Sequence, residues 1–313
     1  MSVPLRTILN QAPMPFASFF DLPGAGSRST SHKPWASNYP EILSPWFHFV
    51  DIDGVQDVLG PEDDLDRLLL SKTVYPLNQT TEALQSEADS VRVFYTHIAH
   101  PIQIAFQHII VQRSETGPPG PTSYAQTVDF SWTQDQQCIL IGELKRHGII
   151  NPSMWRTNTG TTIDNNRKWL GQELRGYCDR YKTTAAVVFD GVYVLFLLFD
   201  LSTQDAVQDP HCPVIGFILP YTSTVLRYYL FRVAALQLRR NLAQMAPPVH
   251  LNGYYRFFEW WSSTPYWEDS NGRRSQEHPR GYTRYFSMEN GAWYWDTPNG
   301  RVQDTMACRI LYA

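Results

Sequence analysis

The sequence lacks an apolar run long enough to cross a membrane. Its longest apolar stretch, residues 185–199, is interrupted by Asp190-Gly191, whereas a spanning helix needs roughly 20 consecutive apolar residues. The N-terminus also lacks a basic segment followed by an apolar one, which is the pattern of a secretory signal. We therefore expect an intracellular protein, nuclear or cytoplasmic, that is not secreted and has no membrane partner.

Cysteine is scarce, and its spacing is not that of a metal site. The four cysteines lie far apart in the chain, at Cys138, Cys178, Cys212 and Cys308. Zinc sites and disulfide frameworks both show closer or more regular spacing. Free thiols in a reducing compartment fit this pattern best.

An excess of positive charge is missing as well. The formal net charge of −4 argues against a protein that coats nucleic acid with its whole surface. A nuclease is compatible with this charge, since its basic surface is local. Residues 145–182 offer such a region, with eight lysines and arginines against three acidic residues, although ordinary solvated helix faces would give the same count.

What the chain does contain is enough apolar material for a full core. It has 313 residues, of which 43% are hydrophobic, an ordinary fraction for a globular protein. Residues 1–45 are rich in Pro, Ser and Gly and predict an extended or partly ordered arm. Residues 46–245 form the main domain, and residues 246–313 form an aromatic-rich extension that we expect to pack on the core.

Periodicity within residues 46–245 predicts alternating helices and strands. An apolar stripe at helical spacing predicts a helix from Thr80 or Thr81 to about His97, with Glu87 beside the stripe. Further helices are expected over residues 164–181 and 223–245, a hairpin over 183–199 with a type I′ turn at Asp190-Gly191, and a strand over 214–219. This order is typical of an α/β fold with a central mixed sheet flanked by helices.

The stretch from Val128 to Lys145 reads as two strands joined by a tight turn. In the first strand Asp129 lies on the polar face, because it alternates with apolar residues. In the second strand Glu143 and Lys145 are two residues apart and therefore project from one face, while Leu144 points the other way. An Asp and a Glu at neighbouring strand ends form an oxygen-rich site suited to Mg²⁺ or Mn²⁺. A lysine beside them can hold a water molecule and stabilise charge on a phosphate.

These residues resemble the motif of the PD-(D/E)xK nuclease superfamily, and especially its fungal nuclease-like domains. The resemblance covers roughly residues 80–245 and departs from the motif at Val128, where the motif has proline although many members vary. It implies a restriction-endonuclease-like fold and a metal-dependent nuclease acting on DNA, with RNA as the second choice. It further implies that Asp129, Glu143, the Leu144 carbonyl and Glu87 hold Mg²⁺ or Mn²⁺, that Lys145 assists the attacking water, and that Gln172 supports the site.

Plainer interpretations exist for each of these features. Glu143 and Lys145 could be a salt bridge on an exposed strand, and Glu87 and Gln172 could be ordinary helix-surface residues. The histidines at positions 97, 100 and 108 lack the spacing of a zinc helix. The C-terminal aromatics could stack on unpaired bases, but packing or a contact with a protein partner or a second copy is the better expectation. The alternative to an enzyme is a catalytically inactive nuclease-like module that binds protein or nucleic acid.

Overall fold

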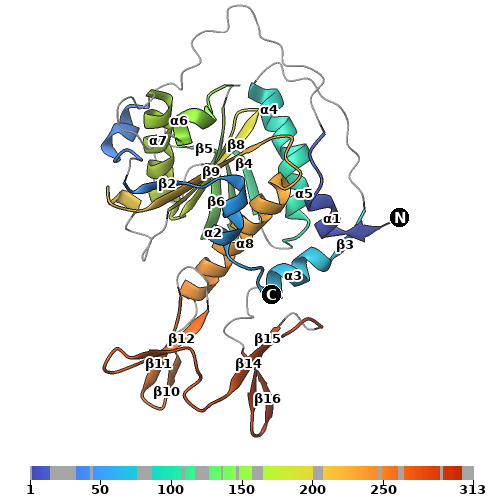
Figure 1. Ribbon diagram of the computed structural model, residues 1–313, viewed down its shortest axis with the longest axis vertical. Coiled ribbons are helices and arrows are strands. Elements are labelled where there is room, and N and C mark those ends of the chain that lie inside the picture. The colour runs from blue at the N-terminus through green and yellow to red at the C-terminus, as the bar shows by residue number, and fades with distance from the viewer. Residues whose placement is uncertain are drawn as a thin grey trace, which may run out of the picture.

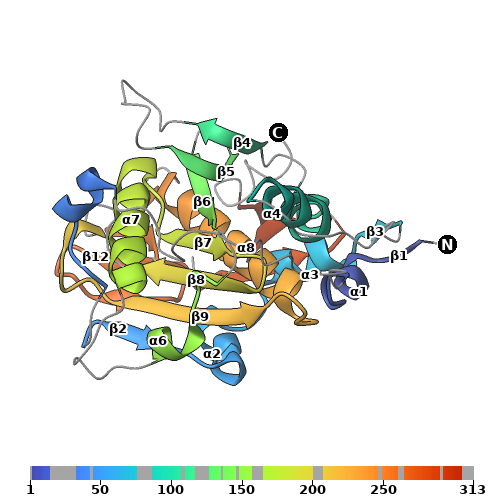
Figure 2. The ribbon, with the colours of Figure 1, turned by 90° about the horizontal axis from the view of Figure 1, so that it is seen from above.

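A seven-stranded mixed sheet organises the computed structural model (Figure 1). The structure describes residues 2–14, 33–42, 45–75, 87–106, 110–116, 127–134, 137–145, 148–156, 165–199, 207–245, 249–259, 264–289 and 292–304. Across the sheet the strands are β2 (Phe47–Phe49), β9 (Val214–Pro220), β8 (Tyr193–Phe199), β7 (Ala185–Phe189), β6 (Gln137–Leu144), β5 (Val128–Gln134) and β4 (Ile110–Thr116). Figure 2 shows them side by side from above. The pairs β6–β7 and β2–β9 are parallel and the others antiparallel, which confirms the predicted α/β class with a mixed sheet.

Both predicted hairpins form, because their apolar strands are buried on both faces of the sheet. The turn between β7 and β8 differs from the prediction. A type I′ turn needs a positive φ at two positions, but only Gly191 has one here, at 89°. Asp190 explains the difference, because its Oδ1 accepts from the backbone N–H groups of Val192 and Tyr193 at 3.0 and 2.8 Å. The turn is therefore set by a side chain rather than by an Asp-Gly type I′ geometry.

Helix α7 (Asn165–Tyr181) covers one face of the sheet, as its apolar periodicity predicts. Leu170, Leu174, Tyr177 and Tyr181 pack on Ile141 and its neighbours in one buried cluster. The short helix α6 (Pro152–Arg156) adds Trp155 to the same cluster. Residue 164, where this helix was predicted to begin, lies outside the described residues.

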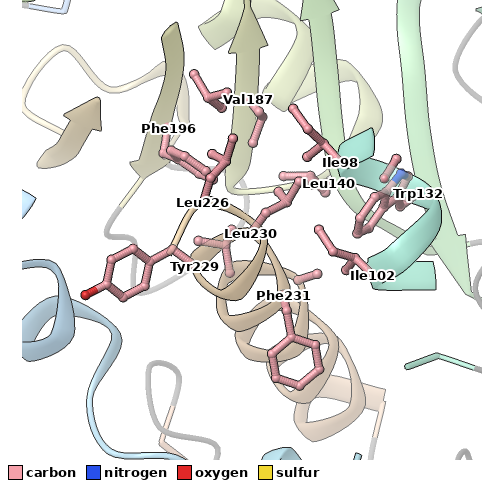
Figure 3. Packing of buried hydrophobic residues seen from close by; sticks show 14 of the residues in the cluster. Ile98, Ile102, Trp132, Leu140, Val187, Phe196, Leu226, Tyr229, Leu230 and Phe231 are labelled. Atoms are coloured by element: carbon pink, nitrogen blue, oxygen red, sulfur yellow. The ribbon is translucent and has the colours of Figure 1, made fainter. Parts of the chain in front are cut away.

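Helix α8 (Leu226–Met245) covers the opposite face together with α4 (Glu87–Val93), η3 (Phe94–Ala99) and α5 (His100–Gln103). Figure 3 shows the packing of α8 on the sheet, with Leu226 and Leu230 beside Leu140 and Val187 of the strands. None of the helices in the described part of the chain combines the length and the apolar character that crossing a bilayer requires.

The helical segment from Glu87 to Gln103 contains Pro101, and it widens into a π-helix just before this proline. The six residues of η3 adopt π-helical geometry, which accommodates a proline that has no N–H and whose ring conflicts with the preceding turn. In a regular helix the N–H of residue 101 would donate to the carbonyl of His97. Here Arg227 of α8 donates to that carbonyl from Nε at 2.6 Å, so a side chain from another helix replaces the lost backbone donor.

The N-terminal residues contribute to the core instead of forming only an arm. Helix α1 (Leu5–Leu9) buries Leu5 and Leu9 in the cluster beneath α8, and β1 (Val3–Pro4) pairs with β3 (Thr73–Val74). In the sequence, η2 (Ile52–Gly54), α2 (Val55–Leu59) and α3 (Asp64–Ser71) precede β3. The amphipathic spacing of Leu5 and Leu9 explains the burial of α1. The Gly-rich stretch 24–29 lies outside the described residues.

The C-terminal extension forms two small antiparallel sheets below the main sheet (Figure 1). The first contains β10 (Val249–Leu251), β11 (Tyr254–Phe258), β12 (Pro265–Asp269) and β13 (Arg274–Ser275). The second contains β14 (Thr283–Ser287), β15 (Ala292–Thr297) and β16 (Gly300–Gln303). Their aromatics pack mostly on one another, with Trp267 and Trp295 both against His278, while Phe286 packs against the main core.

Candidate active site

The ends of β5 and β6 place Asp129 and Glu143 opposite each other. Phe130 pairs with Gly142 in the antiparallel register, so the next residue outward on each strand is Asp129 or Glu143. The Phe130 ring lies over Gly142 so closely that a Cβ added there would stand 1.8 Å from it. Asp129 Oδ2 accepts from the Leu144 N–H at 2.6 Å. The carboxylate of one strand is therefore tied to the backbone of the other.

Lys145 follows directly at the end of β6. Its backbone N–H donates to the Phe189 carbonyl at 2.8 Å, which anchors it to the end of β7. Its Nζ lies 2.9 Å from Glu143 Oε2. Glu143 and Lys145 thus share one face of the strand, on the side of α7, and the Glu143 side chain is 3% exposed. The pair is buried, unlike an ion pair on an exposed strand.

Glu173 of α7 completes this cluster, and sequence reasoning missed it. Lys145 Nζ lies 3.2 and 3.4 Å from its two carboxylate oxygens, and the Tyr177 hydroxyl donates to Oε1 at 3.3 Å. The signal was present, because Glu173 comes three residues after Leu170 and four before Tyr177, both on the buried face of α7. Helical spacing therefore places Glu173 on the face that points toward β6.

Lys33 also reaches the cluster, from a segment predicted to be an arm. Its Nζ lies 2.5 Å from Glu173 Oε1 and 2.5 Å from the Tyr177 hydroxyl oxygen. More than 130 residues separate Lys33 from α7 in the sequence. No local pattern could indicate this contact.

Burial and charge shift the pKa values of the cluster strongly. Burial raises the pKa of Glu143 to about 8, with Lys145 acting against this and the Glu173 and Asp129 carboxylates adding to it. Burial alone would lower the pKa of Lys145, but Glu143 and Glu173 outweigh it and hold the pKa above its ordinary value. Burial, followed by the charges of Glu143 and Glu173, likewise raises the pKa of Tyr177. Shifts of this kind are typical of functional sites.

The remaining predicted site residues lie as follows. Gln172 is buried, and its Nε2 donates to the Tyr39 carbonyl at 2.9 Å. Its neighbour Glu173 is thus the residue of α7 that contacts Lys145. Leu144 points its side chain into the opposite core, and its N–H is the one that holds Asp129. Glu87 begins α4, but its side chain lies outside the described residues, so its role stays a prediction.

The donor set fits a hard divalent cation. Asp129 and Glu143 supply carboxylate oxygens, the ligand type that Mg²⁺ and Mn²⁺ take. Within the described ranges, Glu143 Oε1 is buried and has no hydrogen-bond partner, as expected of an oxygen with room for a further ligand. Among the same residues no three His, Cys, Asp or Glu side chains form a ready group for a metal.

The basic charge of residues 145–182 lies only partly at the surface. Arg167 and Arg175 are buried and donate to backbone carbonyls, Arg167 to that of Met154 and Arg175 to those of Val207 and Asp209. Arg167 thus links α7 to α6 and Arg175 links α7 to the residues before β9, and neither contributes to a basic surface. The paired, more exposed cations of this segment are Arg156, Lys168 and Lys182.

Comparison with models of known protein families, with curated proteins and with solved structures finds no match. The residues of the cluster and their geometry therefore carry the functional argument. They are Asp129, Glu143 and Lys145 from the hairpin, Glu173 and Tyr177 from α7, and Lys33 from the segment before η1 (Pro34–Asn38).

Proposed function

We propose that the protein is a metal-dependent nuclease that hydrolyses phosphodiester bonds of DNA, with RNA as the second choice of substrate. One observation carries the proposal: a buried Glu143–Lys145 pair at 2.9 Å stands opposite Asp129 at the ends of two neighbouring strands. Two carboxylates can hold a divalent cation, and a fixed ammonium group beside them can stabilise negative charge on a phosphate. The motif resembles that of PD-(D/E)xK nucleases, and the mixed sheet flanked by α7 and α8 is compatible with their restriction-endonuclease-like fold.

Each residue has a defined role in this proposal. Asp129 and Glu143 would hold Mg²⁺ or Mn²⁺, with the Leu144 carbonyl and Glu87 as further ligands. The cation would supply positive charge to the phosphate and lower the pKa of a bound water. Lys145 is held in place by Glu143 and Glu173, so its charge does not have to reorganise when negative charge develops on the phosphate. Its ammonium group orients the water and stabilises that charge.

The test is cleavage of plasmid DNA, single-stranded DNA and RNA in the presence of Mg²⁺ or Mn²⁺. We expect Asp129→Ala and Lys145→Ala each to lower the rate by about 100-fold or more, since each removes a preorganised charge. Asp64→Ala is the matched control, because in the described part of the chain Asp64 forms its ion pair with Arg67 on the surface of α3, and it should cleave like the wild type. Unchanged cleavage in the two site variants would overturn the assignment of the site.

A second candidate is a nuclease-like module that binds protein or nucleic acid without cutting it. The observation in its favour is that Lys145 and Lys33 already neutralise Glu143 and Glu173 within the chain. Calorimetric titration with Mg²⁺ and Mn²⁺ separates the two candidates. A nuclease should take up the cation in the wild type and lose most of that uptake in Glu143→Gln, whereas a binding module should show no uptake that depends on Glu143.

A further inference from the structure

Residues 33–42 lie along the outer side of α7, and we call them the α7 strap. The Trp35 ring packs on the Tyr177 ring with centroids 5.1 Å apart. The Tyr39 hydroxyl donates to Asp179 Oδ2 at 3.1 Å, and Gln172 donates to the Tyr39 carbonyl. The strap is therefore attached to α7 by ring packing and by side-chain hydrogen bonds at successive turns.

The sequence of α7 is adapted to receive the strap. A Cβ added to Gly176 would stand 2.5 Å from the Trp35 ring and 2.8 Å from the Tyr39 ring, closer than real Cβ atoms approach other atoms. Glycine in the interior of a helix weakens it by about 1 kcal/mol relative to alanine. The close approach of both rings gives a reason for glycine at this position. At the other end of the strap, Lys168 pairs with Glu41 at 2.5 Å.

The docked strap delivers Lys33 to the candidate active site. Lys33 and Lys145 approach the same oxygen, Glu173 Oε1, at 2.5 and 3.2 Å, and Tyr177 donates to it as well. The Lys33 side chain is 30% exposed and the Glu173 side chain only 3%. Lys33 thus enters from the solvent side and neutralises a carboxylate that is otherwise buried against Lys145.

The charge balance assigns a role to this contact. The carboxylates of Asp129, Glu143 and Glu173 all act on Lys145. Without Lys33, Glu173 would have Lys145 as its only cationic partner among these residues and would draw the ammonium group away from Glu143, because opposite charges in a buried site attract strongly. We propose that Lys33 is a positioning residue, which satisfies Glu173 so that Lys145 stays on Glu143. The proposal concerns the site of the proposed nuclease, but it can be tested without any activity.

The test follows the Lys145 ammonium signal by NMR in full-length protein labelled with ¹⁵N-lysine, assigned by its absence in Lys145→Arg. We expect Lys33→Gln to shift this signal and to speed its hydrogen exchange, because the ammonium group changes partners. Lys33→Arg should keep the wild-type signal, since it keeps the charge. Lys168→Gln is the matched control, because it removes another strap–α7 ion pair of the same length away from the site, and it should leave the signal in place.

A second measurement separates positioning from simple anchoring of the strap. In a Glu173→Gln background, Lys33→Gln should no longer shift the Lys145 signal, because the carboxylate through which Lys33 acts is gone. An unmoved signal in Lys33→Gln, or a shift of the same size in Lys168→Gln, would overturn the proposal.

Activity is an independent readout. If the protein cuts DNA, Lys33→Gln should lower kcat by about 10–100-fold with little change in KM, as expected of groups that orient a catalytic residue, and Lys33→Arg should restore most of it. If no cleavage is found in the wild type, the proposed nuclease function fails, while the NMR result still decides the role of Lys33.

Discussion

At the scale of single residues, the candidate site depends on Gly142 having no side chain. Gly142 stands one position before Glu143 on β6, and the Phe130 ring fills the space over it. Phe130 in turn stands one position after Asp129 on β5. The ring and the glycine therefore set the spacing of the two strands at the point where the carboxylates meet.

We expect Gly142→Ala to destabilise the fold by about 1–3 kcal/mol, because the new methyl group overlaps the Phe130 ring and forces a buried strand pair apart. Urea unfolding followed by circular dichroism measures this. Gly171→Ala is the control, since its Cβ would stand 3.3 Å from Ile42 and the gain in helix propensity, about 1 kcal/mol, acts in the opposite direction. Equal midpoints for the two variants would contradict the role of Gly142.

Local periodicity explains which site residues could be predicted from the sequence. Strand alternation places Glu143 and Lys145 on one face, and the structure has them there, 2.9 Å apart. Glu173 is within reach of the same reasoning, whereas the family motif points to the neighbouring Gln172. The role of Lys33 could not be predicted from the sequence, because its contact with α7 depends on tertiary packing of the strap and not on any local pattern.

At the scale of elements, Pro101 and Arg227 form one unit across two helices. Pro101 takes away a donor from the carbonyl of His97, and Arg227 supplies another at 2.6 Å. The same guanidinium donates to the Ile8 and Gln11 carbonyls at 3.4 and 3.3 Å. A single side chain of α8 thus joins η3 and the end of α1, and burial lowers its pKa to about 10.

We expect Arg227→Met to lower the free energy of unfolding by about 1–3 kcal/mol, because it removes the hydrogen bonds that the buried guanidinium donates to the carbonyls of His97, Ile8 and Gln11. In a Pro101→Ala background the loss should be smaller, since residue 101 then has an N–H that can donate to His97. A double-mutant cycle from chemical unfolding measures the difference, and a coupling of about 0.5–3 kcal/mol is expected for groups that share one partner. Strict additivity of the two substitutions would contradict the replacement of one donor by the other.

Most elements follow from periodicity, and the exceptions have tertiary causes. Helix α7 and the strands β7 and β8 match their predicted spans because long, regular patterns leave little choice. The predicted type I′ turn between β7 and β8 was wrong, because both carboxylate oxygens of Asp190 accept hydrogen bonds. Oδ1 accepts from the N–H groups of Val192 and Tyr193, and Oδ2 accepts from the Ile150 N–H. The predicted arm over residues 1–45 in fact contains a buried helix and the α7 strap. Composition did not predict them, because elements of five residues are too short for it to detect.

At the scale of the whole molecule, the C-terminal extension has a small core of its own. Its centre is His278, whose ring stacks on Tyr282 and contacts Trp267 and Trp295, with centroids 4.5 to 4.9 Å apart. Beside it, Asp304 is buried between Arg256 and Arg284, at 2.9 and 3.1 Å. Aromatic residues that we expected to pack rather than to stack on unpaired bases thus serve in part to hold two small sheets together.

This core should make the stability of the protein depend on pH through His278. Burial, and after it the charges of Arg280 and Arg256, lower the pKa of His278 below its ordinary value of 6.5, with Asp304 acting weakly in the opposite direction. Its Nδ1 accepts from the Arg280 N–H at 3.1 Å, and protonation would remove that acceptor. A pKa that is lower in the folded than in the unfolded state means that the stabilisation is present above pH 6.5 and is lost as the pH falls through the folded-state value.

We therefore expect the thermal unfolding midpoint of the full chain to fall between pH 7.5 and pH 5, and to fall less in His278→Phe, which keeps a ring but has no group that titrates. An NMR titration of the His278 ring in the wild type should give a pKa below 6.5. A pKa at or above 6.5, or the same pH dependence in His278→Phe as in the wild type, would show that the aromatic core does not keep this histidine neutral. The loss of stability would then have to come from other groups.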